Sequence, residues 1–586
     1  MSAATIERQA AASVSSRRWG LSFVGVTRLV AIAVAAVIVL PLAITIWRLV
    51  VDERSLTFGA FADTWNEPGT VAMLRNTILM VGASTTFAVM IAATFAWLNE
   101  RTDARIGWAS ETLPIVPFFV PPLAGAIGWV ILAEPNVGLL NTGVRSIAGW
   151  VGLDLGSSGP IDIYSWYGLI FVTTLYLVPH AYLVIGSALQ NLDPSLEEAS
   201  RMSGAGHLRT LARVTLPAIR PSLISAVLLA LVVGFALYSV PVLIAAGANI
   251  DILSVRIVRL MTRSFPPEMA EAVVLCLIMI VFIGTASFLQ TRATRAGRHA
   301  TIGGRFGGGA IIKLGVMRWP ARAAVIAYLL ASSVLPFVGL VLLSLQKFWS
   351  TDIAWSNLSL ENYNNLFLSG AEFGDATKAL RNSIVLGIVG ATAAILIAAL
   401  ITYYIAARSQ GMLSRAVNSI VKLPGALSHI VLALALIATL AGPPISLGGT
   451  LAILFIAYLV MYMPQASVTA GSAFFQVDRF LQEASRISGA TEFRTFRRVT
   501  LPLMAPGLAS GWIFVFILMV GDLTGSVMLA STNTPVLGTV LLDTFQSGSY
   551  TDVAALSVVA TVVPGMIAIA VLLGTKRLFR IRGRES

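Results

Sequence analysis

A long uncharged apolar run near the start of the chain, LVAIAVAAVIVLPLAITIW at residues 29–47, sets the first limit on what this sequence can become. Its length is close to the roughly 20 apolar residues that a helix needs to cross a hydrocarbon core of about 30 Å. The run is too long for a cleavable signal peptide, and no small-residue cleavage site follows it. Comparable runs recur along all 586 residues, of which 56% are hydrophobic and 12% charged. The sequence therefore predicts a polytopic membrane protein.

We expect an all-α polytopic membrane protein with about twelve transmembrane helices, because a helix satisfies its own backbone groups in lipid. The first six helices and the last six form two parallel repeats in this prediction. The predicted spans are 29–50, 78–98, 113–133, 166–189, 221–243, 268–290, 323–345, 384–407, 421–441, 449–471, 505–528 and 553–575.

The positive charges indicate how the chain is oriented. The formal net charge is +12, and most of the 40 Lys and Arg residues fall in loops on one side of the predicted membrane. This asymmetry follows the positive-inside rule, so the charge needs no nucleic-acid partner. We therefore expect a multi-pass protein of the bacterial plasma (inner) membrane with both termini in the cytoplasm. The predicted cytoplasmic loops are 99–112, 190–220, 291–322, 408–420 and 472–504.

One charged segment occurs twice. EASRMSGAGHLRTLARVTLP at 198–217 and EASRISGATEFRTFRRVTLP at 483–502 agree at 14 of 20 positions although they lie 285 residues apart. LRNTILMVG (74–82) is likewise repeated as LRNSIVLGI (380–388). Six spans return the chain to its starting side, so the halves are related by an axis along the membrane normal. The predicted division is a tail (1–28), a first half (29–290, core 70–290), a basic linker (291–320), a second half (321–578, core 378–578) and a tail (579–586).

The repeated segment has the signals of a short helix in water. Asp193 is a good N-cap, Pro194 suits the first helical position, and Gly204 suits the left-handed stop that ends the helix. Asp478 and Gly489 stand at the same places in the second copy. A second amphipathic stretch is predicted after each glycine. Its apolar positions are Leu208, Leu211 and Val214 in the first copy, and Phe493, Phe496 and Val499 in the second.

The spacing of this segment resembles the EAA loop of ABC-importer permeases. The third residue is Ser in both copies where the family name has Ala, which is a small-for-small change. Fused permeases of this length resemble most closely the ferric-iron importer group, as do AWLNERTD, PFFVPPLAGAIGWVIL and NVGLLN in the first half. The matching positions are Glu198, Ala199, Ser200, Gly204, Leu216 and Pro217, and again Glu483, Ala484, Ser485, Gly489, Leu501 and Pro502.

The resemblance implies a role for each copy. Two ATPase subunits would each receive one short helix, with Glu198 and Glu483 pairing with basic groups on the ATPase while Gly204 and Gly489 permit the bend. A separate solute-binding protein would deliver the solute from outside. ATP and magnesium would be used by the partner ATPase, and no cofactor is expected in this chain.

Several other activities are not indicated. No lysine is preceded by glycine, so the chain has no GxxxxGK[ST] phosphate loop and is not expected to be an enzyme. The histidines show no metal-binding spacing, so no metal site and no catalytic residue are predicted. Cys276 lies in an apolar run, which favours a buried small side chain over a reactive thiol.

Polar residues inside spans are candidates for the translocation path, because they are costly in lipid. Asp522 is the best candidate, with Tyr238 and Ser239 at about the equivalent level of the first half. A local helix–helix hydrogen bond is an equally good reading of Asp522. For His180 and His429 an ordinary structural role is favoured.

The sequence leaves two questions open: which solute is transported and what the long outer loop does. Ferric iron is expected from the resemblance, and thiamine, polyamine, aminoalkylphosphonate or another small organic solute are the alternatives. A six-plus-six secondary carrier is a distant alternative, because the loop NERTDARIGWAS lacks a carrier signature. The outer loop 134–165 is longer than its second-half counterpart, which fits a docking or gating surface and equally fits loop drift.

Overall fold

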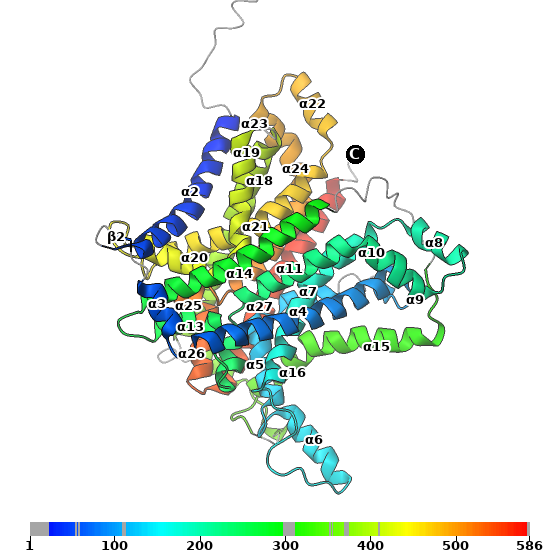
Figure 1. Ribbon diagram of the computed structural model, residues 1–586, viewed down its shortest axis with the longest axis vertical. Helices are drawn as coiled ribbons and strands as arrows, with labels where there is room; N and C mark the ends of the chain where they lie inside the picture. The colour runs from blue at the N-terminus through cyan, green and yellow to red at the C-terminus, as the bar shows by residue number, and fades with distance from the viewer. Residues whose placement is uncertain are drawn as a thin grey trace, which may run out of the picture.

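The computed structural model describes residues 23–52, 55–56, 59–107, 113–296, 311–350, 353, 355–367, 374–407 and 411–582. Residues 297–310 of the predicted linker 291–320 and residues 1–22 of the predicted N-terminal tail lie outside these residues. The described chain is built of helices, apart from a two-stranded hairpin in which Val51 pairs with Leu56 (Figure 1). The all-α prediction is therefore confirmed.

The first half contains most of the helices that surround the first repeated segment (Figure 1). Its elements are α2 (Phe23–Val50), β1 (Val51–Asp52), β2 (Ser55–Leu56), α3 (Gly59–Asn66), α4 (Thr70–Arg101), η2 (Leu113–Phe119), α5 (Pro122–Ala133), α6 (Leu139–Trp150), α7 (Trp166–Gln190), α8 (Pro194–Met202), α9 (His207–Thr210), η3 (Leu211–Thr215), α10 (Leu216–Ala218), α11 (Arg220–Ala236), α12 (Pro241–Gly247), α13 (Leu253–Thr262) and α14 (Met269–Ala296).

The second half largely repeats this order, although its described residues contain no counterpart of α6 or of the β1–β2 hairpin. Its elements are η5 (Gly315–Met317), α15 (Arg318–Leu329), η6 (Leu330–Val334), α16 (Leu335–Ser344), η7 (Trp355–Asn357), α17 (Glu361–Phe367), α18 (Gly374–Ala407), α19 (Met412–Lys422), η8 (Leu423–Ala426), α20 (His429–Leu436), η9 (Ile437–Ala441), α21 (Leu451–Phe475), α22 (Arg479–Ile487), α23 (Glu492–Thr495), η10 (Phe496–Thr500), α24 (Leu501–Val520), α25 (Ser526–Leu529), α26 (Leu537–Gln546) and α27 (Tyr550–Arg582).

The number of continuous spans is smaller than predicted. Within the described ranges, nine helices are long and apolar enough to cross a membrane, or eleven if each of two bent pairs counts as one span. The span predicted at 113–133 is wrong as a single helix, since η2 ends at Phe119 and α5 starts at Pro122. Pro121 and Pro122 lack the N–H that a continuous helix needs there. The span predicted at 421–441 bends by 107° between Ala426 and His429.

Helix ends also differ from the predicted domain limits. α2 begins at Phe23, inside the stretch 1–28 predicted as a tail, and α14 runs to Ala296. α15 begins at Arg318, and α27 continues to Arg582. Each helix thus continues beyond its predicted span, because a helix does not have to stop where the hydrocarbon stops.

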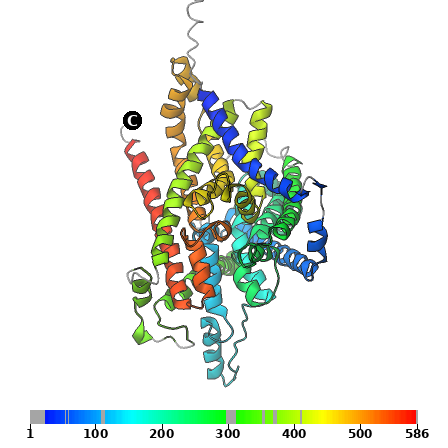
Figure 2. The ribbon, with the colours of Figure 1, turned by 90° about the vertical axis from the view of Figure 1, so that its left-hand side faces the viewer.

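The first helix of each half packs on the other half. α2 lies against α18, α19 and α20 of the second half, and both ribbon views show it beside them (Figures 1 and 2). In return, α16 packs on α5, and the indole N–H of Trp129 on α5 donates to the Ala331 carbonyl at 3.0 Å. The two halves are therefore interlocked rather than merely placed side by side.

The repeated LRN[TS] motif has the same task in both halves. Asn76 and Thr77 on α4 bind the backbone just before α13, where the Leu253 N–H donates to Thr77 Oγ1 at 2.9 Å. On α18 the neighbouring pair Asn382–Ser383 repeats this, with the Leu537 N–H donating to Ser383 Oγ at 2.8 Å. These bonds satisfy orphan backbone groups at the starts of α13 and α26.

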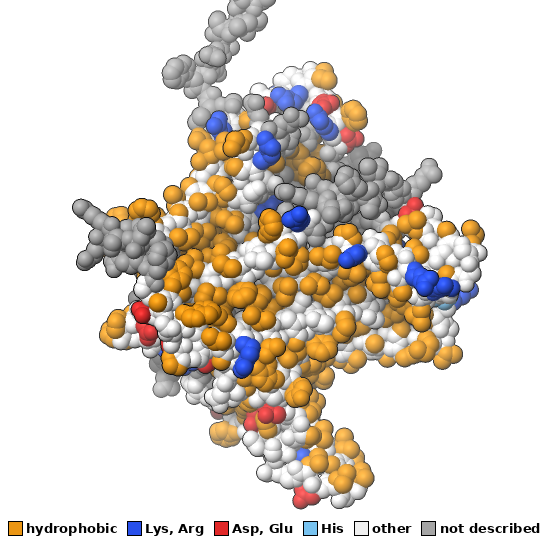
Figure 3. Space-filling view, viewed as in Figure 1, with side chains coloured by type: hydrophobic (Ala, Val, Ile, Leu, Met, Phe, Trp, Pro, Cys, Tyr) orange, Lys and Arg blue, Asp and Glu red, His pale blue; other side chains and the backbone are white. Residues whose placement is uncertain are grey.

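A broad apolar face covers the long helices (Figure 3). On α4, Val71, Leu79 and Met90 are each more than half exposed, as are Val281 and Phe288 on α14. A soluble protein rarely exposes so large an apolar surface. We interpret this face as the one that contacts lipid tails.

Candidate functional site: two projecting helices and a central cavity

The repeated segment folds in both copies into a short helix that projects from the molecule, and α8 and α22 stand at separate corners in Figure 1. Asp193 Oδ1 accepts from the Ser195 N–H at 3.0 Å, and this hydrogen bond holds the pKa of Asp193 below its usual range. Asp478 Oδ1 accepts in the same way at 2.9 Å. Gly204 and Gly489 have φ of +84° and +82°. The predicted caps and left-handed stops are confirmed.

The two predicted serines fix the bend that follows each helix. Ser200 Oγ lies 3.0 Å from Thr210 Oγ1 in the first copy, and Ser485 Oγ lies 3.0 Å from Thr495 Oγ1 in the second. The hydrogen bond ties the short helix to the arm that returns to the membrane. Alanine at this position would leave the threonine hydroxyl without that partner.

The amphipathic stretch predicted after each glycine forms a helical arm that returns to the membrane, and this arm is not α-helical throughout. Each arm contains one π turn, η3 or η10, which ends just before the Leu-Pro pair. Pro217 and Pro502 lack an N–H and would collide with the carbonyl four residues earlier in an α-helix. The wider turn accommodates the proline, and π turns of this kind occur often at functional sites. Leu208, which the sequence places on the apolar face of this stretch, is 78% exposed.

Each projecting helix presents a matching apolar tip to the outside. We call tip 1 the side chains of Leu196, Ala199 and Met202, and tip 2 those of Leu481, Ala484 and Ile487. Met202 and Ile487 are each 87% exposed, and Leu196 and Leu481 are each 49% exposed. The two copies therefore present equivalent apolar surfaces.

Glu198 and Glu483, the two glutamates that the resemblance pairs with an ATPase, differ in their surroundings. Glu483 Oε1 pairs with Arg479 Nε of its own helix at 2.9 Å, on the surface. Glu198 is partly buried. Their predicted pairing with basic groups of an ATPase stays a prediction.

The first copy is attached to the membrane domain by an ion pair that sequence reasoning missed. Arg101 Nε at the end of α4 lies 2.9 Å from Glu197 Oε2 on α8, and the two side chains are only 12% and 8% exposed. Thr215 Oγ1 donates to Glu197 Oε1 at 2.6 Å. The Arg101 guanidinium also donates to the Leu189 and Leu192 carbonyls. An ion pair therefore attaches α8 to the end of α4, and Arg101 in turn attaches this end of α4 to the end of α7.

The second copy is attached by aromatic rings instead. Phe23 at the start of α2 packs on Tyr403, Phe493 and Phe496 with ring centroids 5.3–5.4 Å apart. Gln482 stands where the first copy has Glu197. Because α2 belongs to the first half, the second projecting helix is tied to both halves.

A cavity of about 320 Å³ lies between the halves, at the level where α11 and α24 end. Its polar lining comes from α7, α20, α21 and the breaks after α11 and α24, and Ser239, His180 and His429 belong to it. Tyr238 is buried and is not among the lining residues. The polar lining residues are Tyr176, His180, Ser239, His429, Tyr462, Gln465, Asp522 and Thr524.

Asp522 occupies the break between α24 and α25, at the cavity wall. Its Oδ2 accepts from the N–H groups of Gly525 and Ser526, both at 3.0 Å, and so caps α25. Its Oδ1 accepts from the Tyr462 hydroxyl at 2.8 Å and lies 3.3 Å from His429 Nδ1. Asp522 thus makes local hydrogen bonds between helices, which was the alternative that the sequence left open, and it also lines the cavity.

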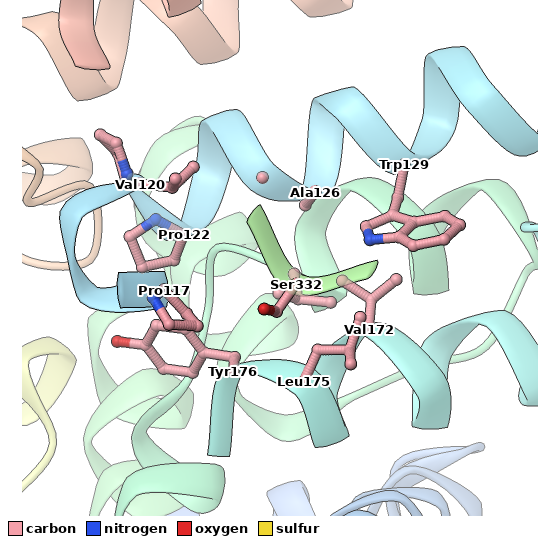
Figure 4. A pocket seen from close by; sticks show the side chains of 12 residues that line it. Pro117, Val120, Pro122, Ala126, Trp129, Val172, Leu175, Tyr176 and Ser332 are labelled. Atoms are coloured by element: carbon pink, nitrogen blue, oxygen red, sulfur yellow. The ribbon is translucent and has the colours of Figure 1, made fainter. Parts of the chain in front are cut away.

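A second, small pocket marks the seam between the halves (Figure 4). Pro117, Ala126 and Trp129 of the first half face Ser332 of η6 across it. Its volume of about 30 Å³ is enough for roughly one water molecule. The π turn η6 frees the Ala331 carbonyl, which accepts the Trp129 N–H described above.

Comparison with known proteins gives one consistent answer for both halves. A family model described as the binding-protein-dependent transport system inner membrane component matches residues 84–296 and 398–581. The "Probable ABC transporter permease protein y4fN" of Sinorhizobium fredii is 29% identical over 437 residues, which cover 72% of this chain and 74% of the relative. The ferric transport system permease protein FbpB of Actinobacillus pleuropneumoniae is 22% identical over 82% of this chain and 68% of its own length.

Among solved structures, one chain from a bacterial ABC transporter that imports the acidic polysaccharide alginate is similar at 19% identity and a TM-score of 0.36. The match covers 45% of this chain and 95% of that chain.

Proposed function

Because the chain belongs to the family of binding-protein-dependent transport system inner membrane components, which are the permeases of ABC importers, we propose that it passes ferric iron across the inner membrane. A permease of this family is a transport protein and not an enzyme. Iron is supported by the ferric transport permeases of Actinobacillus pleuropneumoniae and Haemophilus influenzae, which are 21–22% identical to this chain over 80–85% of its length.

Two copies of an ATPase subunit are the partners of the projecting helices in this proposal. The supporting observation is the pair of matched apolar tips, each on a helix of the same length with the same cap and the same glycine stop. Ala199, Ser200, Ala484 and Ser485 belong to these helices, and Leu216-Pro217 and Leu501-Pro502 end the arms behind them. ATP and magnesium bind in the ATPase subunits.

The direction of transport follows from this arrangement. The loops that carry the tips and both chain termini face the cytoplasm, as the positive charges predict. A loaded solute-binding protein docks on the opposite face, where α6 and the rest of the loop 134–165 project. ATP binding closes the two ATPases beneath α8 and α22 and rocks the halves, so that the central cavity opens outward. Hydrolysis returns the cavity to the inside.

Uptake of labelled ferric iron by cells lacking this protein tests the proposal. Wild type should restore uptake, and the double variant Glu198→Arg with Glu483→Arg should not, because the charge beside each tip is then reversed. Pull-down of the ATPase with each variant shows whether docking is what fails. If the double variant restores uptake and still binds the ATPase, the proposed coupling role of Glu198 and Glu483 is refuted. If iron uptake does not depend on the protein, iron is refuted as the transported solute and the small organic solutes become the candidates to test.

A further inference from the structure

The cavity wall carries its charge on one side only. Among the residues that line the cavity, Asp522 is the one carboxylate, and none is Lys or Arg. The first half places Leu237 where the second half has Asp522, and Leu177 where it has Tyr462. A lone carboxylate in a cavity of low dielectric attracts cations and repels anions.

Two further possible ligand atoms lie beside this carboxylate. Tyr462 Oη and His429 Nδ1 lie 2.8 and 3.3 Å from Asp522 Oδ1, and they come from α21 and α20. Metal–ligand bonds of about 2.0–2.1 Å place neighbouring donors about 2.9 Å apart in an octahedron and about 3.3 Å apart in a tetrahedron. Each of these two distances is thus one that neighbouring ligands of a small cation have.

The surroundings keep these donors in place. Asp522 Oδ2 is held by two backbone N–H groups, which leaves Oδ1 to face its neighbours. The side chain of Asp522 is 3% exposed and that of His429 is 22% exposed, so the open side of the group is at His429, toward the cavity. Gln465, one turn after Tyr462, also lines the cavity, and its side-chain oxygen is buried without a hydrogen-bond partner.

From this geometry we infer that Asp522, Tyr462 and His429 form a transit site for a hard metal cation inside the translocation path. This inference rests on the proposed function and names the residues that meet the solute. Carboxylate, phenolate and imidazole donors suit Fe(III), whereas a solute with several ammonium groups would find only one carboxylate. On binding, the O–H bond of Tyr462 breaks, the oxygen–metal bond forms and the proton passes to water in the cavity. No electron is transferred.

Spectroscopy of the full chain in lipid nanodiscs tests the site. Fe(III) is supplied as its nitrilotriacetate chelate, and the visible charge-transfer band of an iron-bound phenolate is recorded. We expect the band to saturate at one iron per chain and to vanish in Tyr462→Phe. Asp522→Asn should weaken iron binding by about 100-fold, since loss of an outer partner alone costs about 10- to 100-fold.

Tyr458→Phe is the matched control, because it removes one hydroxyl from the same helix one turn away, at a residue that does not line the cavity. It should keep the band. Thermal unfolding without iron shows whether each variant is folded. A band that survives Tyr462→Phe, or a wild type that binds no iron, overturns the inference. If cells still import iron through the protein in that case, the proposed function stands alone. If the band is seen but cellular iron uptake does not need the protein, the metal site is supported and the proposed function is refuted.

Discussion

Replacing Glu197 by Gln is expected to loosen α8 from the membrane domain. The carboxylate lies 2.9 Å from Arg101 Nε, and both side chains are nearly enclosed. Removing one member of a buried ion pair costs about 3–5 kcal/mol, because the other charge stays buried without its partner. Arg101 keeps two carbonyl acceptors, at 2.8 and 3.2 Å, so the lower end of this range applies.

About 3 kcal/mol corresponds to roughly a 100-fold rise in the population of detached α8, since 1.4 kcal/mol is a factor of ten. Amide hydrogen exchange of residues 196–202, measured by mass spectrometry in nanodiscs, reports this population directly. Exchange should become faster in α8 while α22 is unchanged. We further expect weaker stimulation of the ATPase by the loaded binding protein, because a detached helix transmits less motion.

Glu483→Gln is the control, because it neutralises a carboxylate of the matching helix α22 whose partner, Arg479, lies on the surface. Its exchange should resemble that of wild type even if ATPase docking is lost. A double-mutant cycle with Arg101→Gln should show that the two changes together cost less than their sum. Unchanged exchange in Glu197→Gln, or strictly additive effects, would refute the view that this ion pair anchors α8.

Three further changes test other features of the fold. Gly204→Ala should destabilise the end of α8 by about 1–2 kcal/mol because its φ is +84°, whereas Gly206→Ala, at φ −67°, should be tolerated; hydrogen exchange measures both. The lowered pKa of Asp193 means that its contribution to α8 is present above about pH 4 and is lost as the pH falls through the lower folded value, so the protection of the Ser195 N–H relative to its intrinsic exchange rate should fall in acid in wild type but not in Asp193→Asn. Gly128→Ala should cost about 1–3 kcal/mol in thermal unfolding, since its Cβ would lie 2.6 Å from the Pro336 carbonyl oxygen; a variant as stable as wild type would show that the seam between the halves can yield.

Features that depend on neighbouring residues were predictable from the sequence. The cap at Asp193 and the stop at Gly204 need only a few consecutive residues, and both are present as predicted. The broken span at 113–133 shows the limit of the apolar-run argument. Its composition suits a membrane helix, but Pro121 and Pro122 interrupt the backbone hydrogen bonds, and a hydropathy average does not register that.

Features that depend on contacts between distant segments were not predictable. Asp522 stands out in the sequence as a carboxylate in an apolar run, yet Tyr462 and His429 reach it from two other helices. The same holds for Arg101 and Glu197, which meet only because α4 and α7 pack together. The π turns before Leu-Pro follow a local rule, and proline after an amphipathic stretch was the signal that could have found them.

The packing of α2 on the second half has a consequence for how the protein is made. α2 ends at Val50, whereas its main neighbour α18 is complete only at Ala407. At about 5–20 residues per second, a ribosome needs roughly 20–70 s to cover that distance. During this time α2 has lipid where α18 will later pack. The side chains of α2 are apolar all round the helix, which suits a helix that is exposed to lipid until its partner in the second half has been made.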